Sequence, residues 1–140
     1  MNRKSVALCF SIFLLMAIGL VAAEAPNFAG EYADRKFLNG QAVFQMSLEP
    51  SGDTVSVWFG AANNDGSGAA PEAEGTGKVS GKGVLAFKWK DSFKNSGTGR
   101  VTRAGDDIIV SMKTARVSDP RCLAFYGQKM RLKPVKKKEE

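Results

Sequence analysis

The chain has 140 residues with 20 basic and 14 acidic side chains, no histidine and a hydrophobic content of 44%. Without histidine, the chain lacks both the commonest general base and the commonest metal ligand. This length is enough for one domain with its own hydrophobic core, but not for two.

Residues 1–23 have the pattern of a cleavable signal peptide. Arg3 and Lys4 precede an apolar run that ends on Val21-Ala22-Ala23, just before Glu24. A positive segment, an apolar segment and a boundary of small residues are the features that signal peptidase requires. We therefore expect a periplasmic or secreted protein that begins at Glu24. A transmembrane anchor is the alternative, because about 18 apolar residues can span a bilayer.

The expected mature chain has an asymmetric charge. Cleavage after residue 23 leaves 18 basic and 14 acidic residues, a net charge of +4. Residues 24–74 contain two basic and eight acidic side chains, whereas residues 75–140 contain sixteen basic and six acidic ones. Such segregation indicates a surface for anionic partners, and solvating charges segregated by chance are the alternative.

The remaining sequence has the period of β-strands. Apolar and polar residues alternate over 42–48, 54–59, 84–90 and 108–113, and turn residues lie at 51–53, 80–83 and 104–106. After residue 23 no segment has helical periodicity. The pattern predicts an all-β domain over 24–134, a single antiparallel meander barrel or sandwich of about eight strands. The residues that follow, 135–140, are expected to form a flexible basic tail.

An internal repeat supports the meander. Gly75-Thr76-Gly77-Lys78-Val79 recurs as Gly97-Thr98-Gly99-Arg100-Val101, and each copy precedes a turn and an apolar strand. Two such hairpins in succession pair in chain order. The glycines share a face with the valines, the expected inner face. There, a missing side chain permits sharp coiling, or leaves room for a bulky neighbour or a ligand.

The same alternation predicts a basic outer face. By parity, five cations point away from the core on neighbouring strands: Lys78, Lys88, Lys90, Arg100 and Lys113. This patch would attract a polyanion such as lipopolysaccharide phosphate, an acidic glycan or an acidic protein surface. We expect no nucleic acid partner for an exported protein whose patch lacks interleaved aromatic residues. A solvated face that prevents aggregation at strand edges is the alternative.

A second candidate contact site lies around residues 61–74, which have no periodicity and predict a long, functional or mobile loop. Trp58 at the root of this loop points outward if Phe59 points inward. Together with Asn63, Asn64 and Asp65, Trp58 would contact a protein or a sugar. The alternative is a tryptophan covered by the loop itself.

The remaining reactive side chains suggest structural roles. Cys122 is the only cysteine of the expected mature chain, and its apolar neighbours predict a buried, unpaired thiol in the last strand. An exposed Cys122 would instead be available for a bridge between chains. Asp91 and three other aspartates lie at expected turns, where aspartate caps its own backbone. We therefore predict no enzymatic activity, no cofactor and no metal site.

The start of the mature chain resembles the calycin-type barrels, the group that contains lipocalins and avidins. Phe28-Ala29-Gly30-Glu31-Tyr32 is similar to the Gly-x-Trp first strand of that group, with Tyr32 in place of the tryptophan. The resemblance implies an eight-stranded meander barrel. A fainter similarity links Ser67-Gly68-Ala69-Ala70-Pro71 to the Ser-Gly-x-x-Tyr loop of bacterial periplasmic lysozyme inhibitors, although the tyrosine is missing.

Three hypotheses of function follow. The first is an exported, non-enzymatic binding protein (an inhibitor, an immunity factor or an envelope-component binder) that uses one barrel end, the 61–74 loop and the basic outer face. The second is a calyx for a small apolar ligand, lined by Phe44, Val57, Phe87, Trp89 and Val110. The third is an envelope enzyme.

Overall fold

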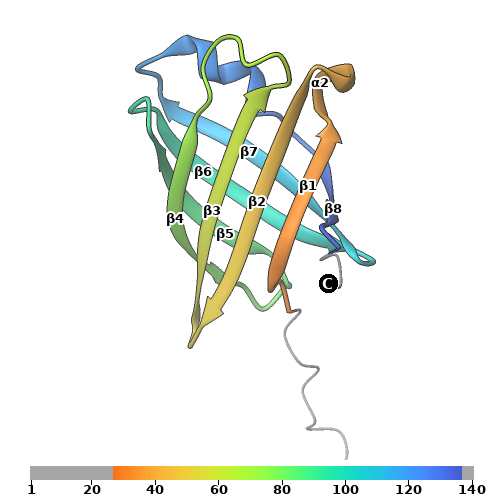
Figure 1. Ribbon diagram of the computed structural model, residues 1–140. Coiled ribbons are helices and arrows are strands. Elements are labelled where there is room, and N and C mark those ends of the chain that lie inside the picture. The colour runs from red at the N-terminus through yellow and green to blue at the C-terminus, as the bar shows by residue number, and fades with distance from the viewer. Residues whose placement is uncertain (1–26, 137–140) are drawn as a thin grey trace, which may run out of the picture.

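The computed structural model describes residues 27–136, which form a closed barrel of eight antiparallel strands (Figure 1). The predicted signal peptide lies outside the described residues. The strands are β1 (Gly30–Lys36), β2 (Ala42–Ser51), β3 (Thr54–Asn63), β4 (Glu72–Val79), β5 (Leu85–Asp91), β6 (Ser96–Ala104), β7 (Asp107–Arg116) and β8 (Met130–Pro134). Two short helical segments, α2 (Phe37–Gly40) and η2 (Pro120–Phe125), complete the fold. Within the described range, no helix has the length and apolar character needed to cross a membrane.

The strand order confirms the predicted all-β meander barrel. Each strand pairs with the next in the chain, and β8 closes the barrel against β1. The three predicted turns connect β2 to β3, β4 to β5 and β6 to β7. This is the architecture that the resemblance to calycin-type barrels implies.

The repeat glycines make room for two large aromatic side chains. On β5, Phe87 lies between Gly77 and Gly99, and Trp89 lies between Gly75 and Gly97. A Cβ atom at Gly97 would be 2.9 Å from the Trp89 indole, and a Cβ atom at Gly99 would overlap the Phe87 ring. At Gly75 and Gly97 a Cβ atom would first meet the backbone carbonyl oxygen of Lys88 or Lys113. The inward glycines therefore serve both close approach of the strands and a bulky neighbour, two of the alternatives that the sequence left open.

A chain of aromatic contacts runs through the core. The rings of Phe44 and Phe59 stack at 5.7 Å between centroids, Phe59 meets the edge of Trp89 at 5.6 Å, and Trp89 lies 4.8 Å from Tyr126. The Trp89 Nε1–H donates to the carbonyl oxygen of Thr98 at 3.0 Å. Such contacts contribute about 0.5–1.5 kcal/mol each beyond the area they bury. They link the β2–β3 wall to the residue that follows η2.

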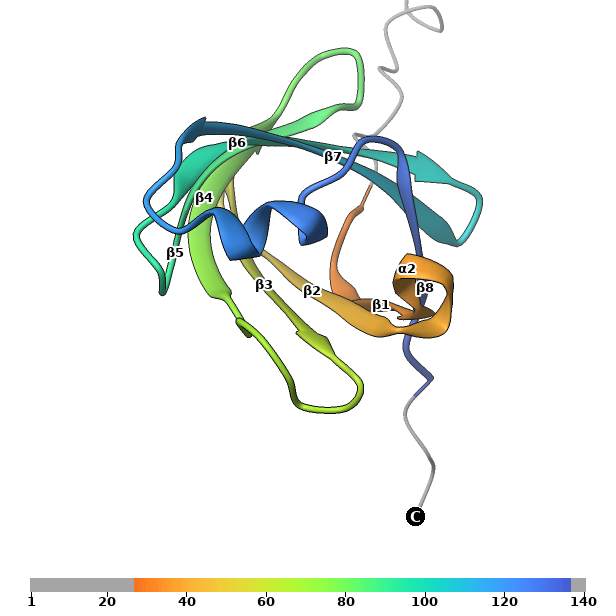
Figure 2. The ribbon, with the colours of Figure 1, turned by 90° about the horizontal axis from the view of Figure 1, so that it is seen from above.

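Both ends of the barrel are covered. Viewed from above, η2 lies across one mouth (Figure 2). At the other end, Phe28 and Tyr32 are buried, and the Tyr32 hydroxyl donates to the carbonyl oxygen of Phe28 at 3.0 Å. The same hydroxyl accepts from Arg103 Nη1 at 3.1 Å.

Two expectations about local structure were wrong. Residues 118–125 contain a helical segment, because Asp119 accepts from the Arg121 backbone N–H as an N-cap and Pro120 occupies the first turn. Cys122 therefore lies in η2 and not in the last strand, although its thiol is buried as predicted.

The predicted 61–74 loop was too long. β3 continues through Asn63, because Ala61 and Ala62 pair with Phe44 and Val43 of β2. β4 begins at Glu72, and Ala73 points into the core. The loop proper covers only 64–71. Alanine side chains hid the period of two, because they give too little contrast in polarity.

We expect Gly99→Ala to lower the free energy of unfolding by about 1–3 kcal/mol or more, as overpacking does in a dense core. Gly81→Ala is the control, because a Cβ atom there meets nothing within 4 Å and its φ is not in the left-handed region. Urea unfolding measures both. Equal stability of the two variants would contradict the packing of Phe87 on Gly99.

Candidate functional site

All five cations of the predicted basic face are exposed on the outside of the barrel. Their side chains alternate with small polar ones across the strands. Lys88 on β5 lies opposite Thr76 on β4 and Thr98 on β6, and Thr98 lies opposite Lys113 on β7. Like charges therefore never face each other directly, an arrangement that limits the repulsion within the face.

The centre of this face is a shallow depression around Ala86. Lys78 and Arg100 lie opposite Ala86 on the two neighbouring strands, and Lys88 lies two residues further along β5. The depression has a volume of about 640 Å³. Its lining contains no carboxylate and consists of Thr54, Thr76, Gly77, Lys78, Ala86, Phe87, Lys88, Thr98, Gly99 and Arg100.

Within residues 27–136, no cation of this face forms an ion pair. Over residues 27–136 there are two ion pairs, Arg121 with Asp119 and Arg131 with Asp107. Neither pair involves a cation of the basic face. The five charges therefore act together on an approaching anion, and salt should screen their field beyond a Debye length of about 8 Å at physiological ionic strength.

Trp58 points outward from β3, as the alternation predicted, and is half-buried. It lies opposite Ser47 on β2 and Glu74 on β4. Its indole covers Gly60, where a Cβ atom would be 3.0 Å from the ring. Trp58 is thus partly covered by its own strand. The carboxylate of Glu74 lies between it and the cation of Lys90 on β5.

Asn63, Asn64 and Asp65 hold the β3–β4 loop together. Asn63 Nδ2 donates to the Ser67 carbonyl at 3.0 Å, and Asn64 Nδ2 donates to the Gly40 carbonyl at 2.8 Å. The Ser67 hydroxyl and backbone N–H both donate to Asp65, which lowers the pKa of that carboxyl. These residues do not line the depression around Ala86, so the predicted site residues separate into two regions.

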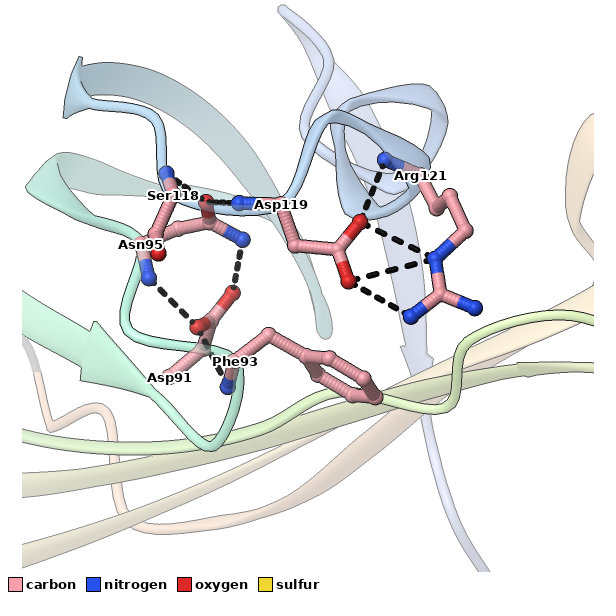
Figure 3. Close-up of polar contacts among 6 residues, drawn as sticks. All are labelled: Asp91, Phe93, Asn95, Ser118, Asp119 and Arg121. Atoms are coloured by element: carbon pink, nitrogen blue, oxygen red, sulfur yellow. Dashed lines mark hydrogen bonds and ion pairs between the residues drawn. The ribbon is translucent and has the colours of Figure 1, made fainter.

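A buried carboxylate anchors the mouth of the barrel (Figure 3). Asp91 Oδ1 accepts from the backbone N–H groups of Phe93 at 2.9 Å and Asn95 at 2.8 Å. Its Oδ2 accepts from Asn95 Nδ2 at 2.9 Å and from the Tyr126 hydroxyl at 2.7 Å. All these bonds serve the local fold, and the first two confirm that Asp91 caps its own turn.

Asn95 extends this hydrogen-bond network to the residues that precede η2. Its side chain is 0% exposed, and its Oδ1 accepts from the backbone N–H groups of Ser118 at 2.7 Å and Asp119 at 2.9 Å. Arg121 pairs with Asp119 at 2.6 Å and lies over the Phe93 ring, 5.7 Å from its centroid. The β5–β6 hairpin and η2 are therefore joined by one polar network (Figure 3).

Two reactive groups, the buried Cys122 thiol in η2 and the hydroxyl of the half-buried Tyr126 just after it, lie at this end of the barrel. Burial raises the pKa of the Cys122 thiol to about 11, so the nucleophilic thiolate is scarce at neutral pH. Burial likewise raises the pKa of the Tyr126 hydroxyl, and the hydrogen bond to Asp91 acts in the same direction. The phenol therefore stays protonated and donates to Asp91. We call the hydrogen bonds of Asp91 and Asn95 the latch, because they hold η2 against this end of the barrel.

Sequence reasoning missed a second basic surface, at the junction of β1 and β8. Arg35 and Lys36 of β1 line one cleft with Arg131 and Lys133 of β8 and with Lys136. The two strands are distant in sequence and meet only because the barrel closes. The alternation of buried Met130 and Leu132 with exposed Arg131 and Lys133 was the signal for β8.

None of the family models, curated proteins or solved structures compared with this chain matches it. Among residues 27–136, no group of three or more cysteine, aspartate, glutamate or histidine side chains is placed to hold a metal ion.

We expect Asn95→Ala to loosen η2 and expose Cys122. The change leaves the Ser118 and Asp119 amides without their acceptor and removes one of the two donors to Asp91 Oδ2. Each buried polar group left without a partner costs about 1–3 kcal/mol. Labelling by a thiol reagent at pH 8 should be slow for the parent and much faster for Asn95→Ala. Thr102→Ala, at an exposed site on β6, is the control. Rapid labelling of the native parent would refute the latch.

Proposed function

We propose that this chain is an exported, non-enzymatic binding protein that holds a phosphate-bearing polymer of the cell envelope on its basic outer face. The observation that supports the proposal is the set of three cations around Ala86: Lys78, Lys88 and Arg100. They surround a depression without any carboxylate, and no residue of the described chain pairs with them.

The chemistry of the depression suits phosphate groups. Lysine supplies a point charge that binds a phosphate oxygen from several directions, and the arginine fork binds two oxygens at once. The hydroxyls of Thr76 and Thr98 add neutral donors at the rim. The small Ala86 side chain leaves space above the sheet.

The spacing of the cations favours a polymer over a single ion. Lys78 and Arg100 lie on strands to either side of β5, so two strand spacings, about 10 Å, separate their backbones. Lys113 extends the face by one more strand beyond β6. Repeated charges along a chain can meet these cations together, whereas one phosphate reaches only part of the set.

The interior of the barrel favours binding on the outside. Phe44 and Val110 are 0% exposed and Trp89 is 3% exposed. A side chain with no accessible surface adjoins no space that would hold even a water molecule. The five side chains of the calyx hypothesis all belong to the packed core cluster, an observation that disfavours a resident apolar ligand.

Export itself is testable. The protein recovered from the export compartment should begin at Glu24, because Val21-Ala22-Ala23 offers small residues at the cleavage boundary. Intact-mass analysis distinguishes this product from the full chain of 140 residues. A protein that retains residues 1–23 would exclude cleavage and favour the membrane anchor.

The triple variant Lys78→Gln, Lys88→Gln, Arg100→Gln should bind lipopolysaccharide micelles at least tenfold more weakly than the parent, a loss of about 1.4 kcal/mol or more. Parental binding should weaken as salt rises. The free energy of unfolding should change by no more than about 0.5 kcal/mol, because all three positions are exposed.

The control is Arg35→Gln, Lys36→Gln, Lys133→Gln, which removes the same charge from the β1–β8 junction. It should bind the micelles like the parent. If both triple variants weaken binding equally, net charge alone attracts the polymer and the basic face is not a site. Unchanged binding of dephosphorylated lipopolysaccharide would exclude phosphate recognition.

A further inference from the structure

The barrel closes through an unusually short ladder. β1 and β8 pair through Tyr32 with Pro134 and Ala33 with Lys133, and the Val135 N–H donates to the Glu31 carbonyl at 2.8 Å. Both strands continue past these pairs and remain paired on their other sides. β1 stays paired with β2 through Asp34, and β8 stays paired with β7 through Met130. The closing ladder therefore stops while both strands are still in place.

Charge opposes extension of the ladder. In the same register Asp34 would come opposite Leu132, and the next hydrogen-bonded pair after Ala33 and Lys133 would then place Arg35 directly opposite Arg131. Like charges in that position destabilise a strand pair. Arg131 turns to the other side, where its Nε donates to Asp107 Oδ2 of β7 at 2.7 Å. Arg35 is exposed, and within residues 27–136 it forms no ion pair.

The unpaired stretch opens into a cleft. Its volume is about 620 Å³, in the range of small-ligand sites. The cleft is lined by five cations and one carboxylate, with a short apolar floor: Arg35, Lys36, Arg131, Lys133, Lys136, Asp34, Ala33, Pro134 and Val135. Asp34 Oδ1 accepts from the Lys36 backbone N–H at 3.0 Å, so part of its acceptor capacity is already used.

The backbone adds a donor to this cleft. Backbone groups of alternate residues in a strand point to the same neighbour, so the Arg35 N–H points toward β8, as the Glu31 carbonyl does. Among the described residues it has no ladder partner there. The only two basic residues of segment 24–74, Arg35 and Lys36, both lie here. Both basic residues of that segment therefore line the β1–β8 cleft.

We infer that the β1–β8 cleft is a binding site for a compact multivalent oxyanion, a small molecule with several carboxylate or phosphate groups. The guanidinium group of Arg35 binds such groups in a bidentate manner, and Lys36 and Lys133 add point charges. A bound anion would also cancel the repulsion that holds the closing ladder apart. Binding should therefore stabilise the junction itself.

Titration calorimetry of the full mature protein at low salt tests this site, with pyrophosphate and citrate as separate probes. We expect one saturable site for at least one probe. Binding of pyrophosphate alone assigns a phosphate ligand, and binding of citrate alone assigns a carboxylate ligand. Arg35→Gln with Lys133→Gln should weaken binding at least tenfold. Arg131 is left unchanged because it pairs with Asp107.

The control variant is Lys82→Gln with Arg116→Gln, which removes the same charge at exposed positions outside both basic surfaces and should leave the small-anion affinity unchanged. Hydrogen exchange adds a local measurement. A bound probe should protect the amides of Arg35 and Arg131 more than the core amide of Val110. Three results would each overturn the inference: neither probe binds, the control weakens binding equally, or protection is uniform. Lipopolysaccharide binding is a separate measurement, so the two proposals fail independently.

Discussion

The packing of Phe87 and Trp89 against four glycines is the contact on which the rest of this barrel depends. Because Gly75, Gly77, Gly97 and Gly99 carry no side chains, β4 approaches the β5 backbone closely, β6 approaches the β7 backbone closely at Gly97, and the two aromatic rings fill the interior. Trp89 in turn supports Tyr126, which holds the latch at the barrel mouth through Asp91. The same strands that bury these rings present Lys78, Lys88 and Arg100 outward.

Much of this arrangement could be predicted from the sequence, because the alternation of apolar and polar residues within each strand determines which side chains point inward. The strands with strong contrast between apolar and polar residues were located, and the outward cations and inward Trp89 followed from parity. Sharp coiling, a bulky neighbour and a ligand were all left open, since sequence does not show what an inward glycine faces. The register of Gly99 against Phe87 decided between them.

The features that the sequence did not predict have a common physical cause. Each of them forms only through contacts with residues far away in the chain. Ala61 and Ala62 extend β3 only because they pair with residues of β2. The role of Asn95 becomes visible only when Ser118, distant in sequence, lies within hydrogen-bond distance of it. The cleft between β1 and β8 forms from the first and last strands. No local pattern around Arg35 indicates that Arg131 will face it. Asp119-Pro120 was a local signal, but a single helical turn is short enough to be overlooked.

Meander topology converts the charge asymmetry of the sequence into an asymmetry of the surface. In a closed meander, strand order along the chain is also strand order around the barrel. The acidic segment 24–74 therefore supplies β1, β2, β3 and the start of β4, and the basic segment 75–140 supplies the remaining wall. Two boundaries must exist on such a surface. One lies at β4, where Glu74 faces Lys90. The other should lie at β1, but Arg35 and Lys36 reverse the sign there and extend the basic surface across the closing strands. A filled core and covered ends leave the outer wall as the accessible surface, so under the proposed function this distribution of charge selects the partner.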